Sequence, residues 1–409
     1  MNILFINKFF WDKGGSETVY FGEMDLLEKH GHTVIPFSMQ DERNRPSEFS
    51  KYFVSNINYE TASKYEKIVA ASRIIYSFEA KKKITELLKN NKIDIAHFHI
   101  FQHQISPSVF APLKKAGIPI VLTLHDLKPM CPNYQMYTKG HTCEKCKGHK
   151  YYNCLLNSCT KGSRAKSLIN TIEMYFHHYM GYYKNVDSYI AVSNFFKDKM
   201  SEFGFRKDNI TYIPNFIDTN RFKYNPGDKG YALFLGRLSK EKGIDKLIQA
   251  CEMTPEIPVV IAGTGPMEEH LKKVVQDKVL SNVSFVGFKS GDDLLKLISE
   301  ASFTILPSQV YENCPMSILE SMATGTPVIG AHIGGIPELI EENIDGLTFN
   351  ASDPASLAEK MKQLWNDPEL RLEMGRKGSE KVHKRNTPEK QYEDLINTYE
   401  SVLNKKTHT

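Results

Sequence analysis

The sequence has no long hydrophobic run, and its first residues do not fit the pattern expected of a secretory leader. Its apolar runs fall far short of the roughly 18 residues that a membrane-spanning helix needs. Residues 1–7 lack the basic start of a signal peptide and predict a first β-strand instead. No nucleic-acid-binding motif accompanies the basic residues, and no side chain is an obvious covalent nucleophile. These absences favour a cytoplasmic protein that binds no nucleic acid.

Cysteine is scarce outside one segment, because residues 131–159 hold five of the seven cysteines. Four of these five lie within 17 residues, at Cys143, Cys146, Cys154 and Cys159. Their spacing favours a structural zinc site, in which His141 and His149 could substitute as ligands. Disulfides do not suit a reducing cytoplasm, and an iron–sulfur cluster has no electron-transfer context here. Cysteines without a metal remain the alternative.

The length of 409 residues predicts two domains of about 200 residues each. Charge is unevenly distributed between the two halves of this sequence. Residues 1–220 hold 29 Lys and Arg against 21 Asp and Glu, a net charge of +8, which leaves −4 for the remainder. The first half includes a cluster of three lysines, Lys81, Lys82 and Lys83. This basic half could favour contact with an anionic surface, although basic residues scattered over a solvated surface with no partner explain the same composition.

The N-terminal half alternates apolar strands with helices. A strand over residues 2–7 leads through Gly14 and Gly15 into a helix over 17–30. Glycines at this point let a phosphate approach the backbone, although a plain tight turn would look the same. A long helix is expected over residues 64–91. Further strands are expected at residues 33–37, 93–98, 118–124, 188–192 and 210–214.

Histidines follow two of these strands. His125 comes directly after the strand over 118–124, at the end where ligands bind in an open parallel sheet. His97, His99 and His103 could suggest a metal site, but alternate residues on one strand face with no nearby carboxylate ligands fit such a site poorly. Packing at a strand end is therefore the preferred interpretation of these three histidines.

Residues 303–335 predict a strand, a loop, a helix and a second strand. The helix is expected over residues 316–323, with Pro315 in its first turn and Asn313 or Cys314 as its cap. The unpaired amides of Met316 and Ser317 would then bind a phosphate. Two glutamates flank these amides: Glu312 before the cap, and Glu320 inside the helix.

This arrangement suits a nucleoside diphosphate sugar. Glu320 lies about 7.5 Å along the helix axis at 1.5 Å per residue, so it would accept hydrogen bonds from the ribose, while Glu312 would accept them from the transferred sugar. A solvated helix face could carry two glutamates as well. Arg237 and Lys242, which follow the strand over 231–235, would stabilise the leaving diphosphate, and Gly263 and Gly265 follow the next strand.

The domain boundary is expected at the Pro-Gly-containing linker over residues 224–230. The N-terminal domain would then comprise residues 1–220, with the cysteine-rich insert at 131–159. The C-terminal, donor-binding domain would comprise residues 221–387. A final helix, at about 388–409, would cross back onto the first domain.

A set of motifs in this order resembles the retaining glycosyltransferases of family 4. The motifs are GGSE at 14, HD at 125, VSNFF at 192, IPNFID at 213, GRLSKEKG at 236, AGTGP at 262 and YENCPMSILESMATGTPVIG at 311. The resemblance implies the α/β GT-B fold, two Rossmann-like domains with parallel sheets facing across a cleft. It also implies that the C-terminal domain binds the donor, that the N-terminal domain binds the acceptor, and that catalysis needs no metal or other cofactor.

The resemblance also assigns roles to single residues. Arg237 and Lys242 look like the diphosphate clamp, Glu312 like the carboxylate that holds the donor sugar, and Glu320 like the ribose ligand. His125 looks like a donor-sugar contact from the other domain. Gly15 resembles the glycine that closes over the phosphate, next to Gly14. The sequence ENCP departs from the family's usual glycine-phenylalanine-glycine after the first glutamate, so the donor sugar does not carry over.

The implied reaction transfers a hexose from a UDP- or GDP-linked sugar to a glycan or lipid-linked acceptor in cell-surface polysaccharide synthesis. Retention would proceed by front-face attack within an ion pair, since a covalent nucleophile is missing. The basic and aromatic segment over residues 161–184, which includes Arg164 and Lys166, suits a peripheral contact with the inner face of the cell membrane, although packing against the first domain would look much the same. Two alternatives are a nucleotide-sugar epimerase of the same fold, which would turn over without an acceptor, and a non-catalytic partner subunit.

Overall fold

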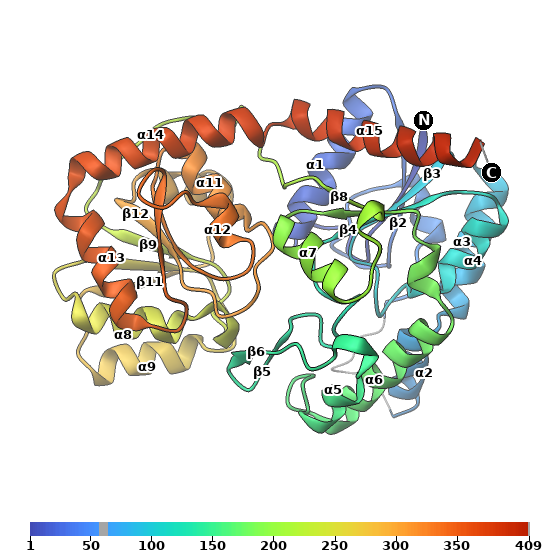
Figure 1. The fold of residues 1–409 in the computed structure, drawn as a ribbon, viewed down its shortest axis with the longest axis horizontal. Helices are drawn as coiled ribbons and strands as arrows, with labels where there is room; N and C mark the ends of the chain where they lie inside the picture. The colour runs from blue at the N-terminus through green and yellow to red at the C-terminus, as the bar shows by residue number, and fades with distance from the viewer. Residues whose placement is uncertain (57–63, 408–409) are drawn as a thin grey trace. The chain divides into compact units, whose positions relative to one another are not determined.

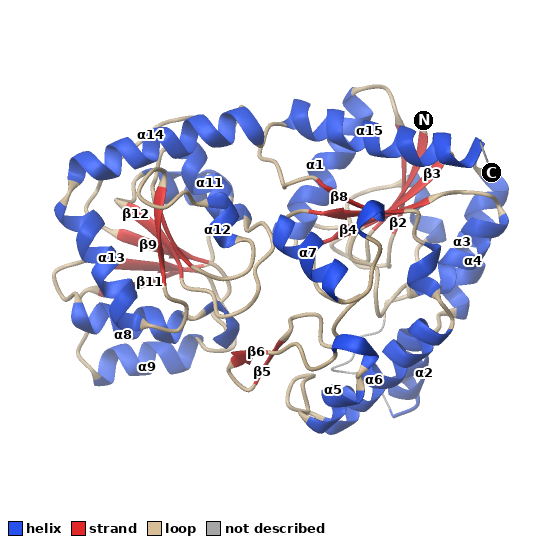
Figure 2. Ribbon diagram, viewed as in Figure 1, coloured by secondary structure: helices blue, strands red, loops and turns tan. Residues whose placement is uncertain are grey.

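The computed structural model describes residues 1–56 and 64–407, and its contacts divide them into two compact units. Of the described residues, unit 1 comprises 1–56, 64–138, 143–214 and 391–407, and unit 2 comprises 139–142 and 215–390. Each unit contains one six-stranded sheet with helices on both sides (Figure 2). The predicted fold class, α/β with two Rossmann-like domains, is confirmed.

All strands of the unit 1 sheet are parallel, in the order β2-β1-β3-β4-β7-β8. In β1, the consecutive apolar side chains from Ile3 to Ile6 are all wholly buried, as expected for a parallel sheet covered on both faces. The strands are β1 (Asn2–Ile6), β2 (Thr33–Phe37), β3 (Ile95–Phe98), β4 (Ile120–Leu124), β7 (Ser188–Ala191) and β8 (Ile210–Tyr212). A short hairpin outside this sheet consists of β5 (Tyr137–Thr138) and β6 (His141–Thr142).

Seven α-helices and five 3-10 helices are described between the strands of unit 1. The α-helices are α1 (Gly15–Lys29), α2 (Lys64–Ile75), α3 (Phe78–Asn90), α4 (Phe110–Lys115), α5 (Tyr152–Leu156), α6 (Arg164–Tyr179) and α7 (Asn194–Glu202). The 3-10 helices are η1 (Glu48–Tyr52), η2 (Pro107–Val109), η3 (Lys147–His149), η4 (Tyr182–Asn185) and η5 (Lys207–Asn209).

The single helix predicted over residues 64–91 is wrong, because the structure divides it into α2 and α3. Ser77 has extended backbone angles, and its hydroxyl accepts a hydrogen bond from the Ala80 amide, so it caps α3. A serine at this position competes with helix continuation, since it satisfies an amide that would otherwise be unpaired.

The unit 2 sheet is also wholly parallel, in the order β11-β10-β9-β12-β13-β14. Its strands are β9 (Ala232–Leu235), β10 (Val259–Ala262), β11 (Val283–Gly287), β12 (Phe303–Leu306), β13 (Val328–Ala331) and β14 (Gly346–Phe349). Its helices are η6 (Lys240–Lys242), α8 (Ile244–Met253), α9 (Glu268–Asp277), α10 (Gly291–Ser299), α11 (Met316–Thr324), α12 (Ile336–Leu339), α13 (Pro354–Asn366) and α14 (Pro368–Arg385).

The last helix, α15 (Pro388–Thr407), packs in unit 1 rather than unit 2 (Figure 1). Leu395, Tyr399 and Val402 are buried in the same apolar cluster as Phe5 and Tyr20. The core of unit 1 therefore includes side chains from both ends of the sequence. None of the helices in the described residues is long and apolar enough to cross a bilayer.

A buried ion pair joins α6 to the loop that follows β4. Lys128 Nζ lies 2.6 Å from Glu173 Oε2, and the two side chains are 1% and 0% exposed. Lys128 Nζ also donates a hydrogen bond to the carbonyl of Pro132, at 3.0 Å. Burial raises the pKa of Glu173 and the neighbouring ammonium of Lys128 opposes this shift, so each charge depends on the other.

We predict that Lys128→Met destabilises unit 1 by about 3–5 kcal/mol, because it leaves the Glu173 carboxylate buried without its cation. The double variant Lys128→Met/Glu173→Met should cost much less, since no unpaired charge remains. Urea denaturation can follow unit 1 alone through Trp11 in a Trp365→Phe background, because these are the only two tryptophans. Equal losses for the single and the double variant would contradict the prediction.

Candidate functional site

The sheet of unit 2 has its switch point between β9 and β12, where chain connections depart in opposite directions. Ligands of open parallel sheets bind outside the carboxyl ends of the strands at such a point. The loop after β9 carries Arg237 and Lys242, and the loop after β12 carries Ser308 and Glu312. The topology thus brings together the cations and the first glutamate that the sequence singled out.

Glu312 is held by two donors. Its Oε1 atom accepts hydrogen bonds from Lys242 Nζ and from Ser308 Oγ, each at 2.6 Å. The Lys242 and Glu312 side chains are 29% and 13% exposed, so the pair is partly shielded from water. Two donors on one oxygen fix the orientation of the carboxylate and reduce its reactivity as a nucleophile. Ser308 was not among the predicted site residues.

Arg237 lies on the same loop as Lys242 but has a different environment. Its side chain is exposed, and no ion pair involves it within the described part of the chain. Lys242 is engaged by Glu312, whereas the guanidinium of Arg237 is available to an anion.

Close loop packing explains two of the predicted glycines. Gly263 has a φ of +140°, and a Cβ there would lie 1.9 Å from the carbonyl oxygen of Gly236. A Cβ on Gly265 would lie 2.4 Å from the carbonyl oxygen of Leu238. These glycines therefore allow the loop after β10 to contact the loop that carries Arg237.

Helix α11 begins at the carboxyl end of β12, as predicted, but its cap differs from the prediction. The N-cap is Pro315, with no side-chain cap hydrogen bond, rather than Asn313 or Cys314. Pro315 has an extended ψ of 122°, so it precedes the first turn instead of joining it. The half-buried Met316 and Ser317 are the first residues of the helix, and helix amides at this position have no intrahelical partner.

Glu320 lies one turn further along α11 and is half-buried. Burial raises the pKa of its carboxyl to about 7, and the charge of Arg221 opposes the shift. A polar ligand that supplies hydrogen-bond donors would favour the ionised form of this carboxyl.

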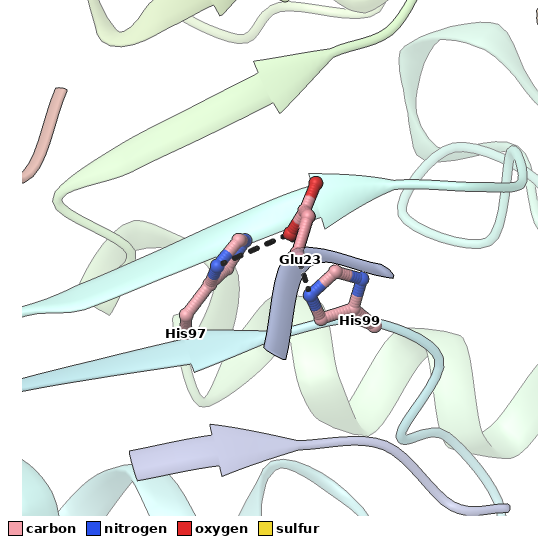
Figure 3. A group of neighbouring side chains, drawn as sticks. All are labelled: Glu23, His97 and His99. Atoms are coloured by element: carbon pink, nitrogen blue, oxygen red, sulfur yellow. Dashed lines mark ion pairs between the residues drawn. The ribbon is translucent and has the colours of Figure 1, made fainter. Parts of the chain in front are cut away.

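In unit 1, His125 follows β4 and contacts a second histidine. Its Nε2 atom lies 2.8 Å from His99 Nδ1, and the two rings stack. His99 Nε2 lies 3.4 Å from Glu23 Oε2 on α1 (Figure 3). Gln391 on α15 donates a hydrogen bond to the other oxygen of Glu23, at 2.7 Å. A buried polar chain thus runs from α15 through Glu23 and His99 to His125.

The expectation that the strand-end histidines lack a nearby carboxylate is wrong for His97 and His99. Glu23, distant in sequence, lies close to both in Figure 3, and the three ligand atoms are within 4.8 Å of one another. His97 nevertheless fits a packing role, because its Nδ1 and Nε2 atoms are engaged by Tyr399 and Thr123 at 2.7 Å each. Glu23 lies on the apolar face of α1, among Val19, Tyr20, Met24 and Leu27. A charged residue on the apolar face of a predicted helix was the sequence signal that could have identified Glu23 as a buried polar residue.

Burial determines the charge states along this chain. It lowers the pKa of His125 to about 4 and raises the pKa of Glu23 to about 8, so both groups are neutral near pH 7. In the hydrogen bond between His99 Nδ1 and His125 Nε2, one of the two nitrogens carries the hydrogen and the other accepts it, so the tautomers of the two rings depend on each other.

The remaining predicted residues lie elsewhere in unit 1. Gly14 and Gly15 are exposed at the start of α1, and Gly14 has a φ of −176°, an extended conformation open to any residue. Cys143, Cys146, Cys154 and Cys159 line one small cavity, together with Cys131.

Two family models match the chain and together span both units. The model described as Glycosyltransferase Family 4 matches residues 13–221, and the model described as Glycosyl transferases group 1 matches residues 216–381. The chain belongs to glycosyltransferase family 4. This glycosyltransferase has the GT-B fold, since its two parallel-sheet domains match those of solved GT-B structures over almost their full length.

Three similar proteins illustrate the range of relatives. An uncharacterised glycosyltransferase of Methanocaldococcus jannaschii is 29% identical over 75% of each chain. The amylovoran biosynthesis glycosyltransferase of Erwinia amylovora is 29% identical over 43% of this chain and 46% of its own. The structure of Anabaena HepE in complex with UDP and glucose matches with a TM-score of 0.67 at 16% identity, covering 98% of this chain and 100% of that one.

We predict that Glu23→Gln changes how the stability of the glycosyltransferase depends on pH. The folded protein keeps a proton on Glu23 up to about pH 8, whereas the unfolded chain has released it above its ordinary pKa of 4.5. Stability therefore falls as pH rises towards 8, by up to about 1.4 kcal/mol per pH unit, and Glu23→Gln removes this loss. Denaturation of both proteins between pH 6.5 and 8.5 measures the difference, and parallel profiles would show that Glu23 is ionised when folded.

Proposed function

We propose that this glycosyltransferase is a retaining hexosyltransferase that takes its sugar from a nucleoside diphosphate donor bound at the switch point of unit 2. The observation that carries the proposal is the cluster of Lys242, Glu312 and Ser308 beside the exposed Arg237. The acceptor, a glycan or a lipid-linked glycan, would bind to unit 1. Relatives in amylovoran and O-antigen synthesis support a role in the assembly of cell-surface polysaccharide.

The cations would act on the leaving group. Cleavage of the anomeric bond places negative charge on the diphosphate, and preorganised donors stabilise such charge by roughly 2–4 kcal/mol each. Arg237 would supply a bidentate guanidinium, and the amides of Met316 and Ser317 would bind a second phosphate oxygen. Glu320 would accept hydrogen bonds from the ribose. A uridine nucleotide is supported by the UDP complexes of Anabaena HepE, and a GDP-linked donor remains the other candidate.

The environment of Glu312 supports a retaining mechanism. Because Lys242 and Ser308 both donate to its Oε1 atom, the carboxylate would orient the sugar rather than attack it. Attack by the acceptor hydroxyl on the face that the leaving group vacates then gives the retained anomer. His125 would contact a bound sugar, and the chain through His99 to Glu23 would hold its ring in position.

We predict that Arg237→Ala lowers turnover of the nucleotide sugar by about 100-fold or more while the melting temperature changes little, because an exposed loop cation contributes little to stability. Lys242→Ala should lower turnover as well, but it also frees Glu312, so Arg237 gives the cleaner test. Lys240→Ala on the same loop is the matched control and should retain turnover. Product anomers can be assigned by NMR; an inverted product or full activity of Arg237→Ala would refute the proposal.

The surface of unit 1 suggests how a membrane-bound acceptor would be reached. Leu168, Ile172, Tyr175 and Tyr179 recur at helical spacing along one side of α6 and are all exposed, Tyr179 to 87%. Tyr152 and Leu156 of the neighbouring α5 are exposed too, and the amide of Tyr152 donates to the Tyr175 hydroxyl at 3.3 Å. We call these six side chains the α5–α6 surface.

Charge complements this apolar surface. Arg164 and Lys166 are exposed in the first turn of α6, and the one acidic residue of that helix, Glu173, is buried with Lys128. Exposed aromatic and aliphatic side chains next to cations are typical of a helix that lies in the interface of an anionic membrane. We propose that the α5–α6 surface binds the membrane peripherally. The Lys81 to Lys83 cluster lies on a different helix, α3.

Vesicle sedimentation tests this contact. Binding to anionic vesicles should weaken with salt, and Ile172→Ser/Tyr179→Ser should abolish it at low salt because the apolar surface is lost. Arg164→Gln/Lys166→Gln should weaken it about 30-fold, at about 1 kcal/mol per charge. Leu372→Ser, an exposed leucine of α14 in unit 2, is the control. Unchanged binding of the α6 variants, or loss only on neutralising Lys81, Lys82 and Lys83, would contradict this assignment.

A further inference from the structure

The cysteine-rich segment has little apolar core of its own. The buried cluster that includes its side chains contains Cys146, Tyr151 and Met174. Regular structure is also short, since the hairpin of β5 and β6 has two residues per strand and α5 has five residues. Small segments of this kind are commonly stabilised by disulfides or by a metal. The structure describes all seven cysteines and places none of them in a disulfide.

Five of these thiols surround one small cavity. It measures about 10 Å³, roughly the space of one water-sized sphere, so it suits a single ion rather than an organic ligand. The lining residues are Cys131, Pro132, Asn133, Tyr137, Thr138, Cys143, Cys146, Asn153, Cys154 and Cys159. Nothing in this set except the thiols is a preferred ligand of a soft or borderline metal ion.

The thiols are close enough to influence one another. Cys146 is close enough to Cys131, Cys143 and Cys159 to interact with them electrostatically. Cys154 interacts with the Cys159 side chain, and its Sγ atom lies 3.8 Å from Thr160 Oγ1. A cation in the cavity would remove the mutual repulsion of neighbouring thiolates.

We propose that Cys143, Cys146, Cys154 and Cys159 bind one structural Zn²⁺ ion in this cavity. The four come in two pairs, one before and one after the start of α5, and pairs of this kind form closed tetrahedral sites. Four thiolates fill the coordination sphere and leave no open position for catalysis. Imidazoles are absent from the cavity wall, so His141 and His149 are not among the ligands.

Cys131 is a neighbour of the ion and not a ligand. Its thiol donates a hydrogen bond to the Oδ1 atom of Asn133 at 2.9 Å. The Asn133 amide in turn donates to the carbonyls of Tyr137 and Cys159, which fixes the wall on this side.

Zinc binding would contract the cluster. Within the described part of the chain, the three potential metal ligands whose donor atoms lie within 4.8 Å of one another are Glu23, His97 and His99. The cysteines form no such set, so their sulfur atoms lie farther apart. Zn–S bonds of about 2.3 Å require the sulfurs to approach more closely than they do in this structure. Cys143, Cys146 and Cys159 lie outside regular helices, so side-chain rotation and small loop shifts can supply this movement. The histidine set is a poorer site, since Tyr399 and Thr123 occupy both ring nitrogens of His97.

Metal analysis of the untagged, full-length protein, purified without chelator, tests the proposal. We expect about one equivalent of zinc in the wild type, and less than about half an equivalent in Cys146→Ser and in Cys154→Ser. Cys131→Ser is the matched control, because serine can still donate to Asn133, and it should retain the full equivalent. Less than half an equivalent in the wild type, or unchanged zinc in both ligand variants, would overturn the proposal. Loss of zinc from Cys131→Ser would overturn the choice of ligands.

Cobalt substitution keeps the test valid if a ligand variant fails to fold. The wild type loaded with Co²⁺ should show the intense visible bands and the sulfur-to-metal charge transfer of a tetrahedral tetrathiolate site. Weak bands of octahedral type would contradict the proposal. Glycosyl transfer need not be measured for either result, so failure of the zinc site is distinguishable from failure of the proposed function.

Discussion

The buried pair of Lys128 and Glu173 is the constraint on which much of unit 1 depends. Two charges removed from water are tolerated only while each satisfies the other, so α6 and the loop after β4 must remain in one relative position. That loop begins with His125, and the same ammonium binds the Pro132 carbonyl, where the cysteine-rich segment begins. One cation thereby positions a candidate sugar contact, the start of the cysteine cluster and the helix that presents the α5–α6 surface.

In unit 2, backbone packing has the corresponding role. The absence of a side chain at Gly263 lets the loop after β10 contact the Arg237 loop. A Cβ on Gly334 would lie 2.5 Å from the carbonyl oxygen of Glu312, so the loop after β13 packs directly against the backbone of Glu312. Lys242 and Glu312 then face each other because of where these loops lie, and their 2.6 Å contact is a result of this packing.

Local patterns were sufficient to predict most of the sheet strands, the two-domain α/β fold and the loops that carry Arg237, Lys242 and Glu312, but not β14 or the hairpin of β5 and β6. Each of the predicted features is encoded within about 20 residues, in apolar runs that end in glycine or proline. The chain from Glu23 through His99 to His125 was not predictable, because its members come from α1 and from two strand ends, and only the sheet order brings them together. The broken helix at Ser77 and the Pro315 cap depended on the backbone conformation of a single residue, which composition does not determine.

The position of α15 has a consequence for the order in which the protein folds during synthesis. Unit 2 is almost continuous in sequence, because it consists of residues 215–390 apart from the short segment 139–142. Its core can therefore form as soon as residues 215–390 have left the ribosome. Unit 1 has most of its sequence available earlier, but Tyr399 fills its apolar core and Gln391 binds the buried Glu23. Until residues 391 onward emerge, the first unit made lacks part of its core, and the apolar side chains that α15 covers in the folded protein stay exposed while the second unit folds.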